Sequence, residues 1–453
     1  MRNRFAVLVL SIALLLSVSM VFAQTAEVTI PDELPAGVTI TYWHEWSQAQ
    51  QETITKVITD FNQTNPYGIT VEEVPLGTSG AVNDQLTTAI VSGDLPNLSG
   101  AIFITNAQSY YLDGVLVPLD AYYNDPKWGF TEEEKADLNQ SLLDINRVAG
   151  EPFNGQMLIW PTGMSANVLA VNMDMLNELG YDAPPTNLQD FHDIACAANE
   201  LTGPNDGDVQ GFPIRIDAFD LYSYIQANGG TIYDADAGQY NFTNEGAVST
   251  LQFFKDLNAE GCAYIPDSPF ANTADFAFGL NPMAMSSSVG VPFINGDIAS
   301  SGSGIENWVM TTVPWSDENR TMQVYLRSMA MFVSSPEEQL ASWLFLKYLA
   351  STDVQVAWTE GVQYQPYTYS GLEGLSEDFL NRIPQFTDVR DLLLDEGVHI
   401  WSVPSLLVQD QVNDVVEEMI TAVVVNGEDV ATAAAAAEAE ANELLAEAMA
   451  DMS

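Results

Sequence analysis

The most conspicuous shortage in this 453-residue chain is of basic side chains. Only 13 lysines and arginines face 62 aspartates and glutamates, which gives a formal net charge of −49 at pH 7. A field of this sign repels phosphate backbones and anionic lipid headgroups. The composition therefore argues against a nucleic-acid partner and against docking on an acidic membrane, and it carries no information on the fold.

Long apolar runs are missing everywhere except at the start. Arg2 and Arg4 precede the nearly unbroken apolar stretch Phe5–Leu16, and Val21–Ala23 has the small-residue pattern of a cleavage site. We therefore predict a signal peptide over residues 1–23, cleaved after Ala23, and a periplasmic or extracellular protein. No cysteine follows the apolar stretch, so a lipoprotein anchor is not expected. An uncleaved N-terminal anchor is the alternative.

Cysteine and histidine are scarce as well. The chain has two cysteines and three histidines. His44, His192 and His399 are far apart in the sequence, and no CxxC or HExxH spacing occurs, so we expect no metal site. An even cysteine count in an exported chain predicts one disulfide, between Cys196 and Cys262, with two small buried thiols as the alternative.

Catalytic motifs are also lacking. The sequence has no G-x-S-x-G elbow, no P-loop and no G-x-G-x-x-G after a strand. Glycoside hydrolysis needs only two carboxylates, but among 62 acidic residues such a pair arises by chance. We therefore expect no catalytic residue, no cofactor and no enzymatic activity.

The chain has enough apolar residues, 47%, for a large core, and its length suits two or three domains. Strand patterns at Val38–Trp43, Gly68–Val74 and Ala101–Ile104 alternate with helical patterns at Gln50–Phe61 and Asn83–Val91. This rhythm predicts an α/β fold with a parallel sheet covered by helices.

The same alternation continues to the C-terminus. Strands are expected at 169–171, 213–216, 308–313, 324–326 and 328–333, and helices at 187–201, 221–227 and 245–260. Ser335–Glu338 has the pattern of a capping box that starts a helix. The last stretch, Leu406–Met452, predicts two helices separated by Asn426 and Gly427.

Aromatic residues at the ends of predicted strands are the first binding candidates. Trp43 to Trp46 follow the first strand, and the carboxyl ends of parallel strands line the ligand crevice of open α/β sheets. Trp160 and Trp401 also lie outside helix cores, whereas Trp343 lies on an apolar helix face and is assigned to the core. Aromatic rings suit the C–H face of a sugar, and ordinary burial is the alternative for each.

Arginines are the second group of candidates because basic residues are so rare. Arg215 and Arg327 lie in or beside predicted strands. A guanidinium can bind a pair of hydroxyls, a carboxylate or a phosphate, and a structural salt bridge is the alternative for both.

Several segments together resemble the extracellular solute-binding proteins of ABC importers, in particular the carbohydrate-binding family that contains the maltose- and glycerol-3-phosphate-binding proteins. The resemblance covers nearly all of the chain after residue 23, and its specificity comes from the order and spacing of the segments. They are Ile40–Trp46, Phe61–Pro66, Tyr110–Leu119, Asn167–Asn172, Leu176–Thr186, Phe276–Gly279, Met283–Ser288 and Ser335–Phe345.

This resemblance implies a two-lobed, periplasmic-binding-protein-like (type II) fold, in which each lobe is a mostly parallel sheet flanked by helices. The chain would cross between the lobes near Met164, near Leu326–Arg327 and near Gln363–Pro366. The N-terminal lobe would comprise residues 24–164 and 328–363, and the C-terminal lobe residues 165–327 and 364–453.

The resemblance further implies that a ligand binds between the lobes. The positions that correspond to ligand contacts, together with Trp160, are Trp43, Glu45, Trp46, Thr105, Asn106, Ser165, Asp217, Phe219, Asp220, Ser287, Ser288, Arg327, Tyr364 and Trp401. Asn281–Pro282 and Met285–Ser288 depart from the family pattern, which fits a mono- or disaccharide better than a long oligosaccharide.

The function implied is that of a monomeric binding subunit that passes a small carbohydrate to the permease of an ABC importer. A glycerol-3-phosphate or polyol carrier, with Arg327 holding the phosphate, is the first alternative. A secreted glycoside hydrolase and a surface protein without a closing cleft are further alternatives.

Overall fold

The computed structural model describes residues 28–148, 152–204, 207–268, 270–316 and 319–451. The predicted signal peptide, residues 1–23, lies outside the described residues. Within the described ranges, no helix combines the length and apolar character that crossing a membrane requires.

The N-terminal lobe begins with the predicted β-α-β-α-β unit. Strands β1 (Thr39–His44), β2 (Thr70–Pro75) and β3 (Leu98–Ile102) are parallel, with β1 in the middle. Helices α1 (Gln48–Thr64) and α2 (Ser79–Ser92) connect them. Helix α1 buries the predicted face of Ile54, Val57, Ile58 and Phe61.

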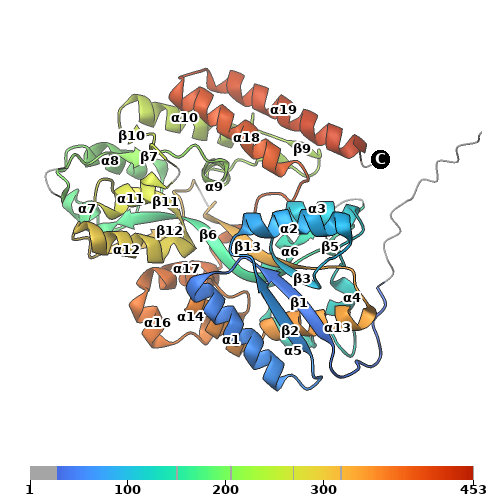
Figure 1. Ribbon diagram of the computed structural model, residues 1–453. Coiled ribbons are helices and arrows are strands. Elements are labelled where there is room, and N and C mark those ends of the chain that lie inside the picture. Colours follow the sequence, from blue (N-terminus) through green and yellow to red (C-terminus); the bar gives the residue numbers. More distant parts are fainter. Residues whose placement is uncertain (1–27, 149–151, 205–206, 269, 317–318, 452–453) are drawn as a thin grey trace, which may run out of the picture.

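Two long strands join this lobe to the rest of the chain. Strands β6 (Trp160–Asn172) and β13 (Thr321–Met331) are antiparallel neighbours, and β13 also pairs with β3. Beyond the N-terminal lobe, β11 (Met283–Ser287) and β12 (Trp308–Thr311) pair with β6, and β14 (His399–Trp401) pairs with β13. One eight-stranded sheet therefore runs through both lobes (Figure 1).

The predicted two-lobed α/β fold is confirmed, but the direction of the strands differs in the C-terminal lobe. There β11 and β12 are antiparallel to β6, whereas a mostly parallel sheet was expected. The chain leaves the N-terminal lobe on β6 and returns on β13 within the same sheet, so these two strands must run in opposite directions.

The other elements flank this sheet or lie at its edges. The remaining helices are α3 (Ile104–Leu112), α4 (Asp120–Tyr123), α5 (Glu132–Asp137), α6 (Gln140–Ile145), α7 (Met173–Glu178), α8 (Leu188–Ala198), α9 (Ala218–Ala227), α10 (Glu245–Ala259), α11 (Ala271–Ala277), α12 (Val291–Ser301), α13 (Pro336–Leu349), α14 (Thr352–Val362), α15 (Tyr369–Glu373), α16 (Glu377–Arg382), α17 (Pro384–Leu394), α18 (Gln409–Ile420) and α19 (Val430–Asp451). The described residues also contain a 3₁₀ turn at Ser288–Gly290 and a π-helical turn at Thr421–Val425. The short strands are β4 (Arg147–Val148), β5 (Gln156–Met157), β7 (Phe212–Pro213), β8 (Tyr233–Asp234), β9 (Gln239–Tyr240) and β10 (Ala263–Tyr264).

Side chains on opposite faces of the sheet belong to different apolar clusters. On β6, Val168 and Ala170 contribute to a cluster that extends into the N-terminal lobe, whereas Leu169 and Val171 contribute to a second cluster beneath α8, α9, α10, α18 and α19. This is the period-two alternation of a strand. It divides the core of the C-terminal lobe into two layers.

Several local predictions are confirmed. Ser335 caps α13 through a complete capping box with Glu338, and Trp343 on that helix is fully buried. Asn426 and Gly427 lie between α18 with its π-helical extension and α19. The structure also contains the predicted disulfide between Cys196 and Cys262.

The three predicted crossing points lie side by side. Met164 on β6 pairs with Leu326 on β13. On its other side, the backbone N–H of Met164 donates to the carbonyl of Gln365 at 3.0 Å and its carbonyl accepts from the N–H of Gln365 at 2.8 Å. Three extended segments of the chain therefore lie side by side between the lobes, each hydrogen-bonded to its neighbour.

Where β6 packs against the segment around Tyr364, only a glycine fits at position 163. A Cβ added at Gly163 would lie 2.7 Å from Cβ of Tyr364, an atom that moves only with the backbone. We predict that Gly163→Ala separates β6 from the segment around Tyr364 and destabilises the protein by about 1–3 kcal/mol. Denaturant unfolding measures this difference. Gly296→Ala on α12, where the added methyl group meets no atom within 4 Å, is the control and is expected to be neutral or stabilising. Equal effects of the two changes would contradict the prediction.

Candidate ligand-binding site

The two crossing strands present a polar face between the lobes. Met164, Ala166, Val324 and Leu326 point into the apolar cluster shared with the N-terminal lobe. The alternate positions point to the opposite face, and register places them opposite one another in pairs, Gly163 with Arg327, Ser165 with Tyr325 and Asn167 with Gln323. These paired positions form the floor of the candidate site.

Arg327 is held at the end of this floor nearer the N-terminal lobe. Its Nε donates to Oη of Tyr364 at 3.3 Å, and Nη1 donates to Oγ of Ser79 at 3.2 Å. Nη1 also lies 3.8 Å from Oε1 of Glu45, and the guanidinium carbon lies 5.5 Å from the centre of the Phe103 ring. Predicted residues Glu45, Arg327 and Tyr364 therefore meet in one cluster.

Glu45 is the buried acid of this cluster. The residue is 7% exposed, and burial raises the pKa of its carboxyl group, while the nearby Arg327 charge and the backbone N–H groups of Glu45 and Ala101 partly oppose that rise. A Cβ at Gly100 would lie 2.8 Å from Oε2 of Glu45. The glycine on β3 therefore makes room for the carboxylate.

Backbone strain gathers around the same cluster. Gln48, Ala101 and Gln363 have φ angles of +50°, +57° and +63°, in the left-handed region that non-glycine residues rarely adopt. Gln48 lies three residues after Glu45 in the sequence. Ala101, which lies on β3, donates a backbone hydrogen bond to the carboxylate of Glu45, and Gln363 directly precedes Tyr364. Strained residues of this kind concentrate at ligand-binding sites.

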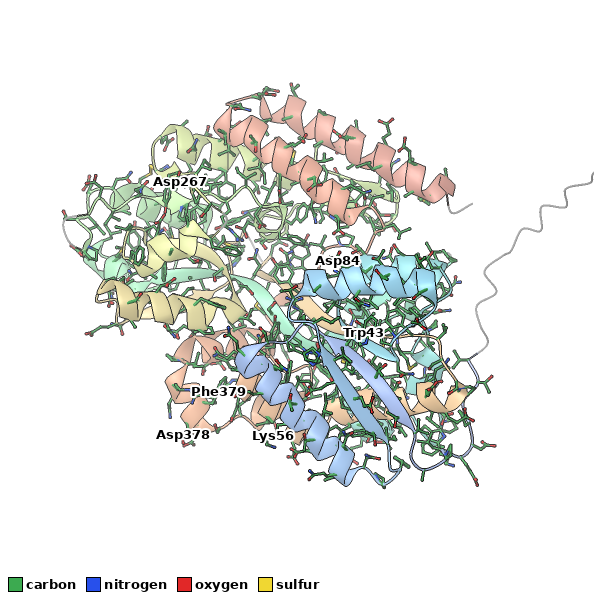
Figure 2. All side chains as sticks on the ribbon, viewed as in Figure 1. Trp43, Lys56, Asp84, Asp267, Asp378 and Phe379 are labelled. Atoms are coloured by element: carbon green, nitrogen blue, oxygen red, sulfur yellow. A yellow bond between two sulfur atoms is a disulfide. The ribbon has the colours of Figure 1, made fainter. Side chains whose placement is uncertain are left out.

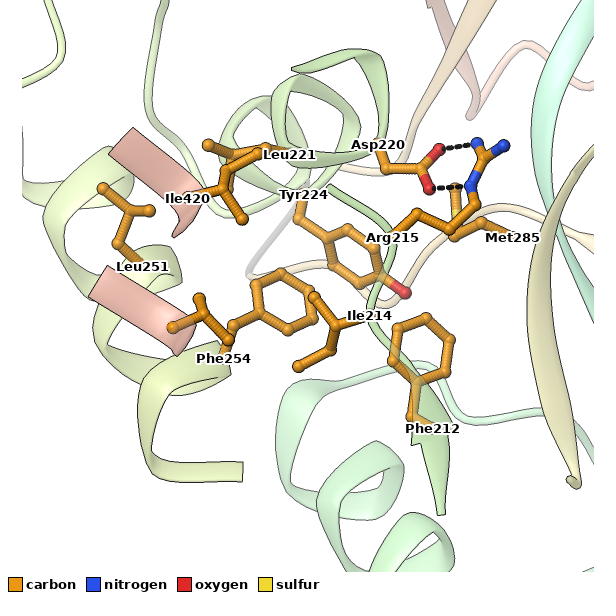
Figure 3. A pocket seen from close by; sticks show the side chains of 11 residues that line it. Phe212, Ile214, Arg215, Asp220, Leu221, Tyr224, Leu251, Phe254, Met285 and Ile420 are labelled. Carbon is orange, nitrogen blue, oxygen red and sulfur yellow. Dashed lines mark hydrogen bonds and ion pairs between the residues drawn. The ribbon is translucent and has the colours of Figure 1, made fainter. Parts of the chain in front are cut away.

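A second charged group lies toward the C-terminal lobe. Arg215 makes a bidentate pair with Asp220, with Nε at 2.7 Å from Oδ2 and Nη2 at 2.6 Å from Oδ1 (Figure 3). Nη2 of Arg215 also lies 3.6 Å from Asp217. Asn167 on the floor donates to Oδ1 of Asp220 at 3.1 Å. This pair therefore connects α9 to the floor of the site.

Asp217 is the least stabilised carboxylate of this group. It is the N-cap of α9 and accepts a hydrogen bond from the backbone N–H of Asp220 at 3.1 Å. Burial and the charge of Asp220 raise its pKa to about 6, against the lowering effect of Arg215. Asp217 therefore changes its charge between pH 5 and 7.

Behind the pair of Arg215 and Asp220 lies a small apolar cavity of about 20 Å³. Figure 3 shows its wall of aromatic and aliphatic side chains, among them Phe212, Tyr224 and Phe254. A volume of this size holds about one water molecule. A cavity of this volume cannot accept a sugar.

Helix α3 of the N-terminal lobe contacts the segment between β14 and α18 and the first turn of α18. Nε2 of the buried Gln108 donates to the carbonyl of Ser405 at 2.7 Å, and Oγ1 of Thr105 lies 3.5 Å from Oδ2 of Asp410. Predicted Asn106 accepts from the backbone N–H of Phe103 at the start of α3. Thr105 and Asn106 therefore lie where the two lobes meet.

Some predicted residues do not reach this region. Trp160, which was predicted to contact the ligand, is fully buried in this structure and donates from Nε1 to Oη of Tyr367 at 3.1 Å. Trp46 is 3% exposed and donates to Oη of Tyr42 at 3.2 Å within the core. Oγ of Ser288 accepts from the backbone N–H of Ala166 at 2.9 Å, which gives it a structural role. Sequence position alone does not separate core tryptophans from partly exposed ones, because buried Trp160 and half-buried Trp43 and Trp401 all lie in strands.

Of the other predicted residues, Phe219, Trp401 and Ser287 border the floor, whereas Trp43 packs against a separate cluster. Phe219 meets the ring of Tyr325 edge-on at 5.6 Å, and Trp401 is paired with Gln323 across β14 and β13. Ser287 pairs with Asn167 on β6. Trp43 is half-buried beneath α2 (Figure 2), against the cluster that contains Val82 and Leu86.

Three residues of the site were missed at the sequence level. They are Tyr325 on the floor and Ser79 and Phe103, which contact Arg327. Tyr325 had a signal, because it precedes Arg327 by two residues and strand alternation places both on one face. Ser79 and Phe103 had none, since their approach to Arg327 depends on the pairing of β13 with β3.

The comparisons with known proteins agree with this architecture. The family model described as bacterial extracellular solute-binding protein matches residues 56–381. No curated protein sequence matches the chain. Among solved structures, the cyclic α-maltosyl-1,6-maltose binding protein from Arthrobacter globiformis has a TM-score of 0.74 at 18% identity, covering 90% of this chain and 99% of that one.

Two further structures are similar to the same extent. The sugar-binding protein MalE from Xanthomonas citri has a TM-score of 0.74 at 19% identity, over 92% of this chain and 99% of that one. UgpB from Mycobacterium tuberculosis, solved with glycerophosphocholine, has a TM-score of 0.71 at 16% identity, over 91% and 99%. At these identities the similarity establishes the fold.

Since the family model matches most of its length, this chain belongs to the bacterial extracellular solute-binding proteins. The members of this family are binding proteins, which agrees with the absence of catalytic motifs from the sequence.

The raised pKa of Asp217 predicts a specific pH dependence. Because the folded pKa of about 6 exceeds the ordinary value of 3.8, the folded state binds more protons between these values, and Asp217 makes stability fall as pH rises from about 4 to 6. We predict that Asp217→Asn, which keeps a capping oxygen, stabilises the protein at pH 7.5 and has little effect at pH 4. Urea unfolding at both pH values measures the difference, with Asp94→Asn in an exposed loop as control. A stabilisation that is equal at both pH values would contradict the prediction.

Proposed function

We propose that this protein is the substrate-binding subunit of an ABC importer, which captures a neutral mono- or disaccharide between its lobes and delivers it to the permease. The family assignment and the fold shared with sugar-binding proteins support this function. In this proposal the ligand lies over the floor formed by β6 and β13. The N-terminal lobe comprises residues 24–164 and 328–363, and the C-terminal lobe residues 165–327 and 364–453.

The observation that carries the proposal is the charge pairing of both arginines at the site. Arg215 is neutralised by Asp220, with Asp217 close by, and Arg327 faces Glu45. Neither guanidinium offers an uncompensated positive charge to a phosphate. Each still has N–H donors, and the carboxylates are acceptors, which is the mixture that recognises hydroxyl groups.

Unsatisfied donors at the end of the floor add to this argument. Nε2 of Gln323 and Nε1 of Trp401 are buried and have no acceptor among the described residues. Buried N–H groups are nearly always hydrogen-bonded, so each such group requires an explanation. Hydroxyl oxygens of a ligand would satisfy both donors, while the ring of Trp401 would cover the apolar face of a sugar.

The direct test is a ligand screen on the chain after residue 23, by thermal shift and calorimetry, with glucose, maltose, maltotriose, ribitol and glycerol-3-phosphate. A bound ligand at 100 times its dissociation constant stabilises the folded state by about 2.7 kcal/mol. A neutral mono- or disaccharide is expected to raise the melting temperature and glycerol-3-phosphate is not. Tight binding of glycerol-3-phosphate would establish the phosphate-carrier alternative, and release of a hydrolysed product would establish a hydrolase.

Arg327 is the residue whose removal distinguishes a ligand contact from a structural ion pair. Replacing Arg327 alone leaves the charge of Glu45 buried and unpaired, so the informative variant is Arg327→Ala with Glu45→Gln. We predict a loss of affinity of about 10- to 100-fold, the value of a hydrogen bond from a charged donor. Arg320→Ala, which removes an arginine paired with Asp395 outside the floor, is the control. Unchanged affinity in the double variant would make the role of Arg327 structural.

Trp401 is predicted to contribute by ring contact. Trp401→Ala should weaken sugar binding by about tenfold or more, because stacking and covered apolar area are both lost. The matched control is Trp315→Ala, since Trp315 is also half-buried against the second cluster but lies near the far end of α9. Calorimetry compares the affinities, and circular dichroism checks the fold of both variants. Equal losses in the two would remove Trp401 from the site.

A further inference from the structure

The environment of the disulfide contains two further groups that bind metals. His192 and Cys196 lie one turn apart on α8, and Glu260 and Cys262 lie just after α10. One ligand atom from each of these four residues lies within 4.8 Å of the other three. The two halves are 66 residues apart between the cysteines, so the spacing along the sequence did not reveal the cluster.

The orientation of His192 suits a metal ligand. Its Nδ1 lies 3.0 Å from Oδ1 of Asp193, and its Nε2 lies 2.7 Å from Oε2 of Glu260 and 3.6 Å from Sγ of Cys196. A carboxylate that accepts from one ring nitrogen fixes the tautomer and leaves the other nitrogen to bind a metal. Asp193 therefore acts as the supporting carboxylate for Nε2.

Hydrogen bonds fix the backbone of Cys262, and one hydrogen bond joins the two halves independently of the sulfur–sulfur bond. The N–H of Cys262 donates to the carbonyl of Leu257 at 3.0 Å, and its carbonyl accepts from Phe212 at 2.9 Å. Nδ2 of Asn199 beyond α8 donates to the carbonyl of Gly261 at 2.9 Å. The Cα atoms of the two cysteines are 4.4 Å apart, and we expect these hydrogen bonds to keep the cysteines close when the bond is broken.

We propose that reduction of the Cys196–Cys262 disulfide converts this cluster into a four-coordinate Zn²⁺ site. Its ligands are the two thiolates, Nε2 of His192 and one carboxylate oxygen of Glu260. Two sulfurs, one nitrogen and one oxygen are a donor set that tetrahedral zinc accepts. While the disulfide is intact its sulfurs are not thiolate donors, and His192 and Glu260 pair with each other.

The chemistry balances with a dithiol as the reductant. The dithiol supplies two electrons and two protons, the bond between Cys196 and Cys262 breaks, and the reductant becomes a disulfide. Zinc then binds as the two thiols release their protons. The side chains of His192 and Glu260 are 30% and 54% exposed, which gives the ion a route to the site.

The test uses the chain after residue 23, oxidised or reduced under argon with a phosphine, and titrated with Zn²⁺ against a chelating indicator. The reduced protein is expected to bind one zinc per chain, and the oxidised protein none that competes with the indicator. Co²⁺ in place of zinc should give the absorption of thiolate-bound, tetrahedral cobalt. A reduced protein that leaves the indicator saturated would overturn the proposal.

Variants separate this site from zinc bound elsewhere. His192→Ala keeps the disulfide in the oxidised protein, and after reduction it should bind zinc at least about tenfold more weakly. Asp193→Ala should weaken zinc binding about 10- to 100-fold without removing a ligand. His399→Ala, which removes an exposed histidine on β14, is the matched control and should bind as the unaltered protein does. Equal zinc affinity in the variants of His192 and His399 would overturn the proposal.

If reduction alone unfolds the chain, circular dichroism measures whether zinc refolds it. Zinc should then restore the folded spectrum of the reduced protein but not that of reduced His192→Ala, because binding free energy becomes folding free energy. Refolding of both, or of neither, would count against the site.

Discussion

The antiparallel pairing of β6 with β13 is the interaction on which the rest of the structure depends. It extends from Asn167 with Gln323 to Trp160 with Met329, so it belongs to both lobes. Because a strand exposes alternate residues on opposite faces, the same pairing supplies apolar side chains to the core and polar ones to the space between the lobes. The register shift between Arg327 and Ser328 falls within this pair. A shift of this kind bends a strand and redirects its side chains, and here it lies where Arg327 meets Gly163.

Burial of charge explains how basic residues are used at the site. In a chain with a net charge of −49, acidic partners are abundant, and both arginines of the site have them. A buried ion pair stabilises little overall, because desolvation offsets most of the attraction. The effect of such an ion pair is to hold the guanidinium in a fixed position. Arg215 is fixed by Asp220, and Arg327 by Tyr364, Ser79 and Glu45, so each guanidinium presents its remaining donors in a defined direction.

The sequence predicts local features of this fold well and long-range pairings poorly. The first β-α-β-α-β unit, the capping box of α13, the division of the C-terminal helices and the disulfide all follow from patterns within a few residues or from cysteine number. Strands β6 and β13 were predicted only in fragments, since residues buried on both faces show no alternation. Trp160 was assigned to the ligand site, although its side chain is fully buried at the start of β6. Which face of a strand points to the core depends on partners that are distant in sequence.

The two groups of site residues are attached to different lobes. Arg327, although it lies on a crossing strand, is bound to the N-terminal lobe through Ser79 and Glu45, whereas Arg215 and Asp217 are bound to α9 in the C-terminal lobe. Side chains also connect the lobes where Gln108 donates to Ser405. A ligand that contacts both groups has its full set of hydrogen bonds only when the lobes are close, and it can favour closure only by that difference in affinity. The register shift in β13 lies beside Arg327, and the left-handed residue Gln363 directly precedes Tyr364, so both backbone irregularities lie where the three extended segments pass from one lobe to the other.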